Sequence, residues 1–121
     1  MSVFVHPPRS CGIRFAIRQP NLVLVHVRGE LDLATAPDLE SRLVTTVVAQ
    51  RRGVLVVDLA RLDFLGVAGI NALLKVRCQA ERRNVEFRLV AATRTVLLPL
   101  ELLDLGRAFS LHPTVDTAMP R

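Results

Sequence analysis

Val54-Leu55-Val56-Val57-Asp58-Leu59 is the stretch that decides the fold of this chain, because it is an apolar run rich in β-branched residues with a single charge. Such a run is typical of a central strand that is covered on at least part of both faces. Strands of this kind belong to parallel or mixed sheets, whose connections are usually helical. We therefore expect helices on either side of it.

The segment before this strand is predicted to be a helix. Its apolar residues recur at helical spacing: Ala36, Leu39, Leu43, Val44, Val47 and Val48. Thr35 stands three residues before Asp38, with Pro37 in the first turn, and this arrangement predicts a capped helix start. Gly53 marks the end of the segment.

The segments after the strand continue the alternation of helix and strand. A second helix is predicted from residue 67 or 68 to residue 83, with Ile70 and Leu73 on its apolar stripe. Pro99 would remove a hydrogen bond inside a third helix, so its regular part is expected to begin near Leu98 or to be kinked. The remaining predicted elements are a strand at 85–91, this third helix within 95–105, a short strand at 109–111 and a terminal turn or helix at 113–119.

A hairpin is predicted near the N-terminus. Ile13, Phe15 and Ile17 alternate with charged or small residues, the pattern of a strand with one wet face. Gln19-Pro20-Asn21 connects it to a second strand at 22–28. The predicted order is β-β-α-β-α-β-α-(β)-α, an α/β fold with a mixed sheet and helices mostly on one face.

Length and composition favour a single domain. Half of the 121 residues are hydrophobic and the net charge is only +5, which excludes an intrinsically disordered chain. The apolar, uncharged run at 64–74 is shorter than the about 20 residues that a membrane span needs. The N-terminal residues lack the features of a secretory signal, so a cytoplasmic protein is expected, and Cys11 and Cys78 fit that compartment. We predict an extended N-terminal arm at 1–12 and one domain at 13–118.

The net positive charge of the chain does not by itself indicate nucleic-acid binding. The 16 basic residues are all arginine except Lys75, and they are scattered. Arg14, Arg18 and Arg28 lie on strand-like segments, and cations near helix C-termini complement the helix dipole. The chain has neither Trp nor Tyr to stack on a base. Direct nucleic-acid binding is therefore disfavoured, and a steep fall of affinity with salt would be its sign.

Candidate catalytic and metal-binding residues form no recognisable motif. The following histidines and cysteines never fall at the spacing of zinc ligands: His6, His26, His112, Cys11 and Cys78. No G-x-S-x-G nucleophile motif occurs. Asp58 and Asp63 could form a carboxylate pair for acid–base chemistry, but an aspartate that caps a loop at a strand end is more common. We expect no enzymatic activity, no metal site and no cofactor.

Gly66-Val67-Ala68-Gly69 is a small-residue turn between a predicted strand and a helix N-terminus. Free backbone N–H groups in such a turn can receive an anion. The turn lacks the Gly-Lys-Ser/Thr ending of a Walker phosphate-binding loop. By itself it indicates only a tight connection from strand to helix.

Four groups of segments, in chain order, carry a family resemblance: Gly29-Glu30-Leu31-Asp32 before Thr35-Ala36-Pro37; Val56-Val57-Asp58-Leu59 with Leu62-Asp63-Phe64-Leu65; Gly69-Ile70 with Leu73-Leu74; and Leu102-Leu103-Asp104-Leu105 with Arg107 and Phe109. They resemble a STAS domain, the fold of bacterial anti-sigma factor antagonists. The resemblance spans residues 13–118 in the right order, which makes it more specific than any single motif.

The resemblance implies a bacterial switch in transcription regulation. In this family the unphosphorylated antagonist binds an anti-sigma factor with a histidine-kinase-like ATPase fold and so frees a sigma factor. That kinase inactivates the antagonist by phosphorylating a Ser or Thr in an Asp-Ser-Ser-Gly type loop, which here corresponds to Gly66-Val67-Ala68-Gly69. Ala68 occupies the acceptor position, and residues 47–92 contain neither Ser nor Thr. The loop therefore cannot be phosphorylated.

The resemblance also implies a partner-binding surface, which we expect to comprise Asp32, Asp63, Gly66, Val67, Ala68, Gly69 and Ile70. A phosphate would add a charge of about −1.5 to −2 there, enough to disrupt an acidic or apolar contact. Our first hypothesis is an antagonist that is locked in its binding-competent form.

A second hypothesis is a structural or sensory STAS module in a larger signalling or transport assembly. In that case the loop has lost its acceptor because the protein no longer meets a kinase. A gene neighbourhood that encodes an anti-sigma factor would favour the first hypothesis, and one that encodes a transporter or sensor the second. The sequence leaves the oligomeric state open, with a dimer among the options.

Overall fold

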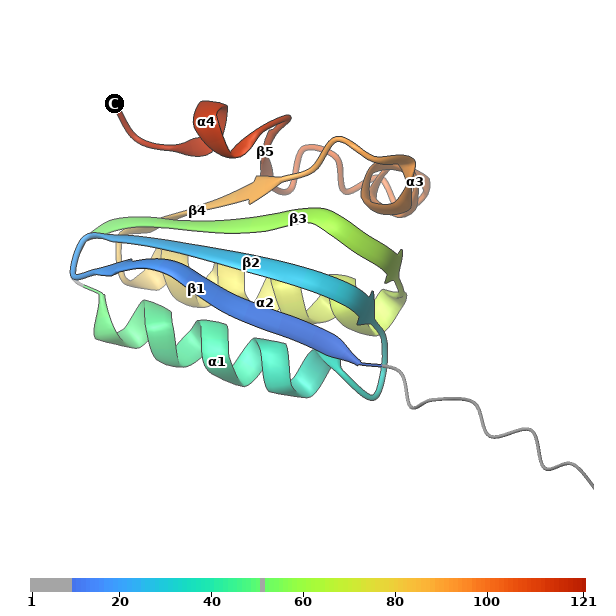
Figure 1. The fold of residues 1–121 in the computed structure, drawn as a ribbon, viewed down its shortest axis with the longest axis horizontal. Coiled ribbons are helices and arrows are strands. Elements are labelled where there is room, and N and C mark those ends of the chain that lie inside the picture. The colour runs from blue at the N-terminus through green and yellow to red at the C-terminus, as the bar shows by residue number, and fades with distance from the viewer. Residues whose placement is uncertain (1–9, 51) are drawn as a thin grey trace, which may run out of the picture.

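A computed structural model describes residues 10–50 and 52–121 of the chain (Figure 1). The described residues form five strands and four helices: β1 Cys11–Gln19, β2 Leu22–Leu31, α1 Ala36–Ala49, β3 Gly53–Leu65, α2 Val67–Arg82, β4 Val85–Val90, α3 Arg94–Leu102, β5 Ser110–His112 and α4 Val115–Ala118. This order agrees with the prediction. The predicted arm at 1–12 lies mostly outside the described residues, and the first strand begins at Cys11 rather than at Ile13.

The strands form one mixed sheet in the order β1-β2-β3-β4-β5. β1 pairs with β2 in antiparallel fashion, whereas β2, β3, β4 and β5 pair in parallel. Parallel neighbours need a crossover connection, and α1 and α2 supply the first two. The predicted mixed sheet is therefore present, with the hairpin as its antiparallel edge.

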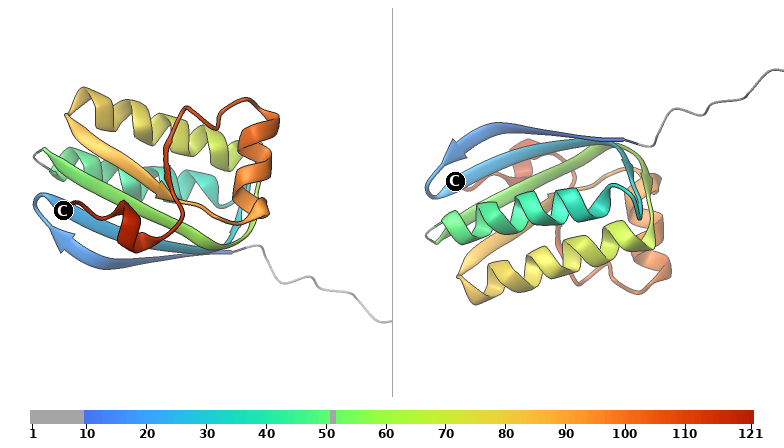
Figure 2. Two further views of the ribbon diagram at one scale, coloured as in Figure 1. Left: turned by 90° about the horizontal axis from the view of Figure 1, so that it is seen from above. Right: turned by 90° about the horizontal axis from the view of Figure 1, so that it is seen from below.

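α1 and α2 lie side by side on one face of the sheet, which we call the covered face (Figures 1 and 2). Alternate strand residues on this face form the core: Val23, Val25, Val27, Leu55, Val57, Leu59, Val85, Phe87 and Leu89. They are joined by helix residues such as Leu39, Leu43 and Leu73, which are fully buried. Since each such side chain contributes about 1.5–3 kcal/mol on burial, the covered face is the main source of stability.

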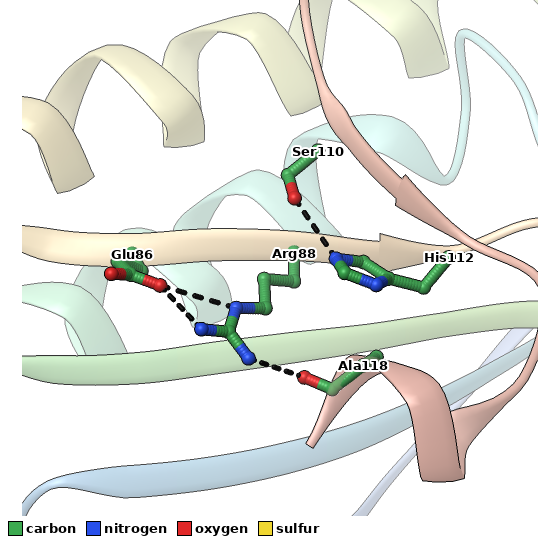
Figure 3. A network of polar contacts seen from close by, with 5 residues as sticks. All are labelled: Glu86, Arg88, Ser110, His112 and Ala118. Carbon is green, nitrogen blue, oxygen red and sulfur yellow. Dashed lines mark hydrogen bonds and ion pairs between the residues drawn. The ribbon is translucent and has the colours of Figure 1, made fainter. Parts of the chain in front are cut away.

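We call the opposite face the open face. The short helix α4 lies over part of it (Figure 2, left). A small second cluster lies under it: Leu24, Val54, Val56, Val90 and Ala118. Arg88 holds α4 on the sheet, because its Nη1 donates to the Ala118 carbonyl at 2.8 Å while its Nη2 donates to the Glu86 carboxylate at 2.6 Å (Figure 3). The remainder of this face carries polar side chains. The prediction of helices mostly on one face is thus correct for the two long helices.

β3 is longer than predicted. We expected a strand at 54–59, whereas β3 continues to Leu65. Leu31 at the end of β2 pairs with Leu65, so the two strands extend together. Leu62 and Leu65 are both buried. A loop would have exposed these side chains to water, and the extended strand instead places them in the core.

α3 begins earlier than predicted and includes Pro99 within it. The proline has no N–H, so the Thr95 carbonyl four residues before it loses its helical donor. Val96 and Leu100 lie in the covered-face core. Their burial offsets the lost hydrogen bond. Of the two alternatives predicted, the start near Leu98 is wrong, and the helix instead includes Pro99.

The two cysteines are free thiols. Cys11 is half-buried in β1, and this burial raises the pKa of its thiol, with a further contribution from the Asp38 and Asp32 carboxylates. Cys78 is exposed on α2. No helix in the described ranges is long and apolar enough to cross a membrane. Within those ranges, His, Cys, Asp and Glu side chains do not gather in threes that could hold a metal ion.

Candidate partner-binding surface

Asp32 organises the turn between β2 and α1. Its Oδ1 accepts the backbone N–H of Ala34 at 2.9 Å and that of Thr35 at 3.1 Å. The Thr35 hydroxyl accepts the Asp32 N–H at 2.9 Å and donates to the Glu30 carbonyl at 2.7 Å. Asp and Thr favour such turns because their side chains satisfy backbone groups that leave the strand. We call residues 32–35 the Asp32 turn, and its Leu33 side chain is 82% exposed.

Thr35 is the N-cap residue of α1, as predicted, but its side chain does not cap the helix in the way that was expected. A capping residue normally has extended backbone angles, whereas Thr35 has φ −100° and ψ −25°, within the helical region. Its hydroxyl points back to the end of β2 and, within the described chain, makes no capping bond to α1. Thr35 therefore stabilises the turn, while Pro37 lies in the first turn of the helix as predicted.

The start of α2 is tied to the end of β2. Gly66 is the N-cap of α2, and its N–H donates to the Leu31 carbonyl at 2.9 Å. Gly69 packs against the same residue, since a Cβ there would lie 2.7 Å from Leu31 Cγ and 3.0 Å from the Leu31 carbonyl oxygen. Only glycine allows this close approach. The fold thus holds the Asp32 turn and residues 66–69 side by side.

Ala68, the second residue of α2, lines a shallow groove between α1 and α2. The groove has a volume of about 620 Å³, and Leu33 and Pro37 line its opposite side. Glu40 of α1 and Lys75 of α2 form an ion pair across it at 3.7 Å. An alanine side chain carries no group that can accept a phosphate, so this position offers only apolar contact.

Exposed apolar side chains lie at this edge of the molecule. Val67, at the first position of α2, is 62% exposed, and Leu33 projects from the adjacent turn. Phe64 is partly exposed, and its ring lies close to Gly66. Contiguous apolar side chains on a surface mark interaction sites. Sequence reasoning missed Leu33, although its position outside the helical apolar spacing was a usable signal.

Of the seven predicted site residues, only Ala68 lines the groove. Ile70 is buried in the covered-face core, so it packs the start of α2 against the sheet. Asp63 is exposed and lines a different hollow, together with Arg28 and Arg61. The surface is therefore built from the Asp32 turn, Val67 and Ala68, with Gly66 and Gly69 shaping the backbone beneath.

The predicted carboxylate pair is divided between two hollows. Asp58 is buried, its Oδ2 lies 2.7 Å from Nδ1 of His26, and its Oδ1 accepts the Ala60 N–H at 3.0 Å. Asp63 lines the neighbouring hollow. Asp58 thus has the role of a strand aspartate that satisfies a backbone N–H. Sequence reasoning missed its partner His26, because the contact depends on the register of β2 against β3.

Comparison with known proteins places this architecture among characterised regulators. Residues 16–118 match the STAS domain family. Two Mycobacterium tuberculosis proteins are similar: anti-sigma-F factor antagonist RsfA, 33% identical over 100 residues that cover 80% of this chain and 77% of RsfA, and anti-sigma-F factor antagonist RsfB, 32% identical over 98 residues that cover 81% and 79%. The crystal structure of an anti-sigma factor antagonist from Mycobacterium paratuberculosis superposes with a TM-score of 0.81 at 30% identity, covering 94% of this chain and 95% of that one. These similarities confirm the fold predicted from the sequence.

Proposed function

The chain belongs to the STAS domain family, and we propose that it is an anti-sigma factor antagonist, a regulatory binding protein rather than an enzyme. Its partner is an anti-sigma factor with a histidine-kinase-like ATPase fold. The partner docks on the surface formed by the Asp32 turn, Val67 and Ala68. Such a role is exercised in the bacterial cytoplasm.

One observation carries this proposal: Leu31 joins the two segments into a single surface. The Gly66 N–H donates to the Leu31 carbonyl and Gly69 packs against the Leu31 side chain, while Leu33 and Val67 remain exposed. Protein interfaces combine apolar anchors of this kind with a polar rim. Here the Glu40–Lys75 ion pair supplies charged groups beside the anchors. The backbone beneath is held by packing, so the surface is organised before a partner binds.

We further propose that this surface is not switched by phosphorylation of the loop. Ala68 has no hydroxyl, and neither do the residues around it from 47 to 92. A phosphate would place a charge of about −1.5 to −2 beside Glu40 in the groove and repel an acidic or apolar partner. Without that charge, binding of the partner persists regardless of kinase activity.

The loss of the acceptor equally favours a second function, a structural or sensory STAS module in a larger signalling or transport assembly. A protein that never meets a kinase has no use for a hydroxyl in this loop. Such a module would be recovered with transporter or sensor subunits. The two functions therefore predict different binding partners, an anti-sigma factor for the antagonist and transporter or sensor subunits for the module.

Affinity capture of the tagged full chain from a lysate of its own bacterium, with added ADP or ATP, tests the proposal. We expect mass spectrometry to identify an anti-sigma factor of the kinase-like ATPase fold. Recovery of transporter or sensor subunits, or of no protein at all, would contradict sigma-factor control and leave only the fold.

Phosphate transfer from the recovered partner is the next test. With labelled ATP, we expect no label in residues 66–70 of the natural chain and label in A68S. The matched control is A60S, because Ala60 is exposed in β3 outside the groove. Peptide mapping must separate this label from Ser41 and Thr45 of α1, which line the same groove. Label in the loop of A60S, or none in A68S, would oppose the assignment of Ala68.

A further inference from the structure

We propose that the open face of the sheet carries a binding site for a small phosphate-bearing molecule. The site is a hollow of about 360 Å³ lined by Arg14, His26, Arg28, Asp58 and Arg61. Small-molecule sites in proteins typically have volumes of about 300–1,000 Å³. This site lies on different residues from the partner-binding surface and does not depend on the proposed function.

Strand register brings the charged side chains together. Arg14 is opposite His26 across the β1–β2 ladder, and His26 is opposite Asp58 across the β2–β3 ladder. Arg28 is opposite Arg61 in the next row. Because directly opposite residues on neighbouring strands share a face of the sheet, all five side chains line one hollow.

The hollow carries an excess of positive charge. Three guanidinium groups face one carboxylate, and Asp58 is already engaged by His26 and by the Ala60 N–H. None of Arg14, Arg28 and Arg61 forms an ion pair with a carboxylate in residues 10–50 or 52–121. Like charges directly opposite each other on a sheet are destabilising, as in the pair Arg28 and Arg61. An anion placed between them would relieve that repulsion.

His26 is held in position to contact such an anion. A carboxylate only accepts hydrogen bonds, so the Nδ1 atom that faces Asp58 at 2.7 Å carries the proton. Nε2 is then the ring atom that remains for a ligand, accepting from a phosphate hydroxyl or, when protonated, donating to a phosphate oxygen. This hydrogen bond to Asp58, which is only 9% exposed, orients the imidazole.

Gly12 allows Arg28 to lie across the edge of the hollow. A Cβ at Gly12 would be 3.0 Å from both Cγ and Nε of Arg28. The absence of a side chain at position 12 therefore leaves room for the guanidinium arm next to β1. Arg28 and Arg14 thus line the same hollow from neighbouring strands.

The lining selects the chemistry of the ligand. Guanidinium groups present a planar fork of donors that matches phosphate oxygens, and such charge-assisted bonds are strong. The residues that line the hollow include no Phe, Tyr or Trp on which a base could stack. Asp63 lines the adjoining hollow and adds a negative border there. These features favour a compact phosphorylated molecule over a nucleic-acid strand.

Titration of the full chain with pyrophosphate at constant ionic strength tests the site. We expect saturable binding by calorimetry, with NMR shifts concentrated at the His26 ring and at the backbone amides of Ile13 and Val27. R28M and R61M remove one charge each while keeping most of the side-chain stem, and each should weaken binding about tenfold. R83M is the matched control because Arg83 is exposed at the end of α2, and its affinity should stay within about twofold of the natural chain.

Binding that does not saturate, or that falls equally in R83M, would overturn the proposal and indicate only general attraction of anions. Binding of an oligonucleotide at these residues without binding of pyrophosphate would also overturn it. The backbone spectra of free R28M and R61M show whether each variant is folded. Capture of the anti-sigma factor by R61M should be unchanged, so the result is independent of the proposed function.

Discussion

The two faces of the sheet are built from the same strands but perform different tasks. In β3, Leu55, Val57 and Leu59 enter the core under α1 and α2, whereas Val54 and Val56 form a small cluster under α4 and Asp58 meets His26. The strand residues of the covered face that form the core are all apolar. The open face mixes a small apolar cluster with arginines and one buried carboxylate.

This difference teaches where the chain can change without losing its fold. Close packing on the covered face leaves few substitutions that keep both volume and shape. The open face gains less from packing, so charged side chains are tolerated there. The proposed partner-binding surface lies where the end of β2 meets the start of α2, next to residues of the covered-face core.

The largest expected effect comes from truncating one leucine on each face. L55A removes a fully buried side chain from the covered-face core and should lower the free energy of unfolding by about 2–5 kcal/mol. L24A removes a side chain from the smaller open-face cluster, and its loss should lie at the lower end of that range. Urea unfolding followed by circular dichroism measures both. Equal losses would show that the open-face cluster contributes as much as the main core.

A smaller effect is expected from a methyl group at the helix start. G69A would place a Cβ against Leu31, and this clash outweighs the about 1 kcal/mol gained in helix propensity. We expect a net loss of about 1–2 kcal/mol in the free energy of unfolding. The control is G106A, because a Cβ at Gly106 meets no atom within 4 Å, and its effect should stay within about 0.5 kcal/mol. A neutral G69A would mean that Leu31 can move and that the contact does not hold the two segments together.

Much of the covered face could be predicted from the sequence. The unbroken run at 54–59 and the apolar spacing of α1 and α2 are strong local signals, and the structure contains each of these elements. The extension of β3 to Leu65 was not predictable in this way, because its support comes from Leu31, a residue distant in sequence. The role of Thr35 was missed for a similar reason, since its hydroxyl bonds a carbonyl of the preceding strand.

The candidate site was only partly predictable. The resemblance to the family singled out Asp32 and residues 66–69, and the structure places both segments beside Leu31. The resemblance could not show that Asp63 lines a separate hollow with Arg28 and Arg61, because that depends on the length of β3. The hollow on the open face arises from three strands in register, and single-sequence periodicity carries no information on register.

The affinity of the recovered anti-sigma factor for V67D tests the central claim most directly. Val67 is 62% exposed at the start of α2, so a carboxylate there should leave the fold intact and place a charge within the partner-binding surface. V48D is the matched control, since Val48 is a valine near the end of α1 that is 47% exposed and lies outside the Asp32 turn and residues 66–69. We predict that V67D weakens binding at least about tenfold while V48D stays within about twofold of the natural chain. Equal affinities of V67D and V48D would contradict the assignment of this surface.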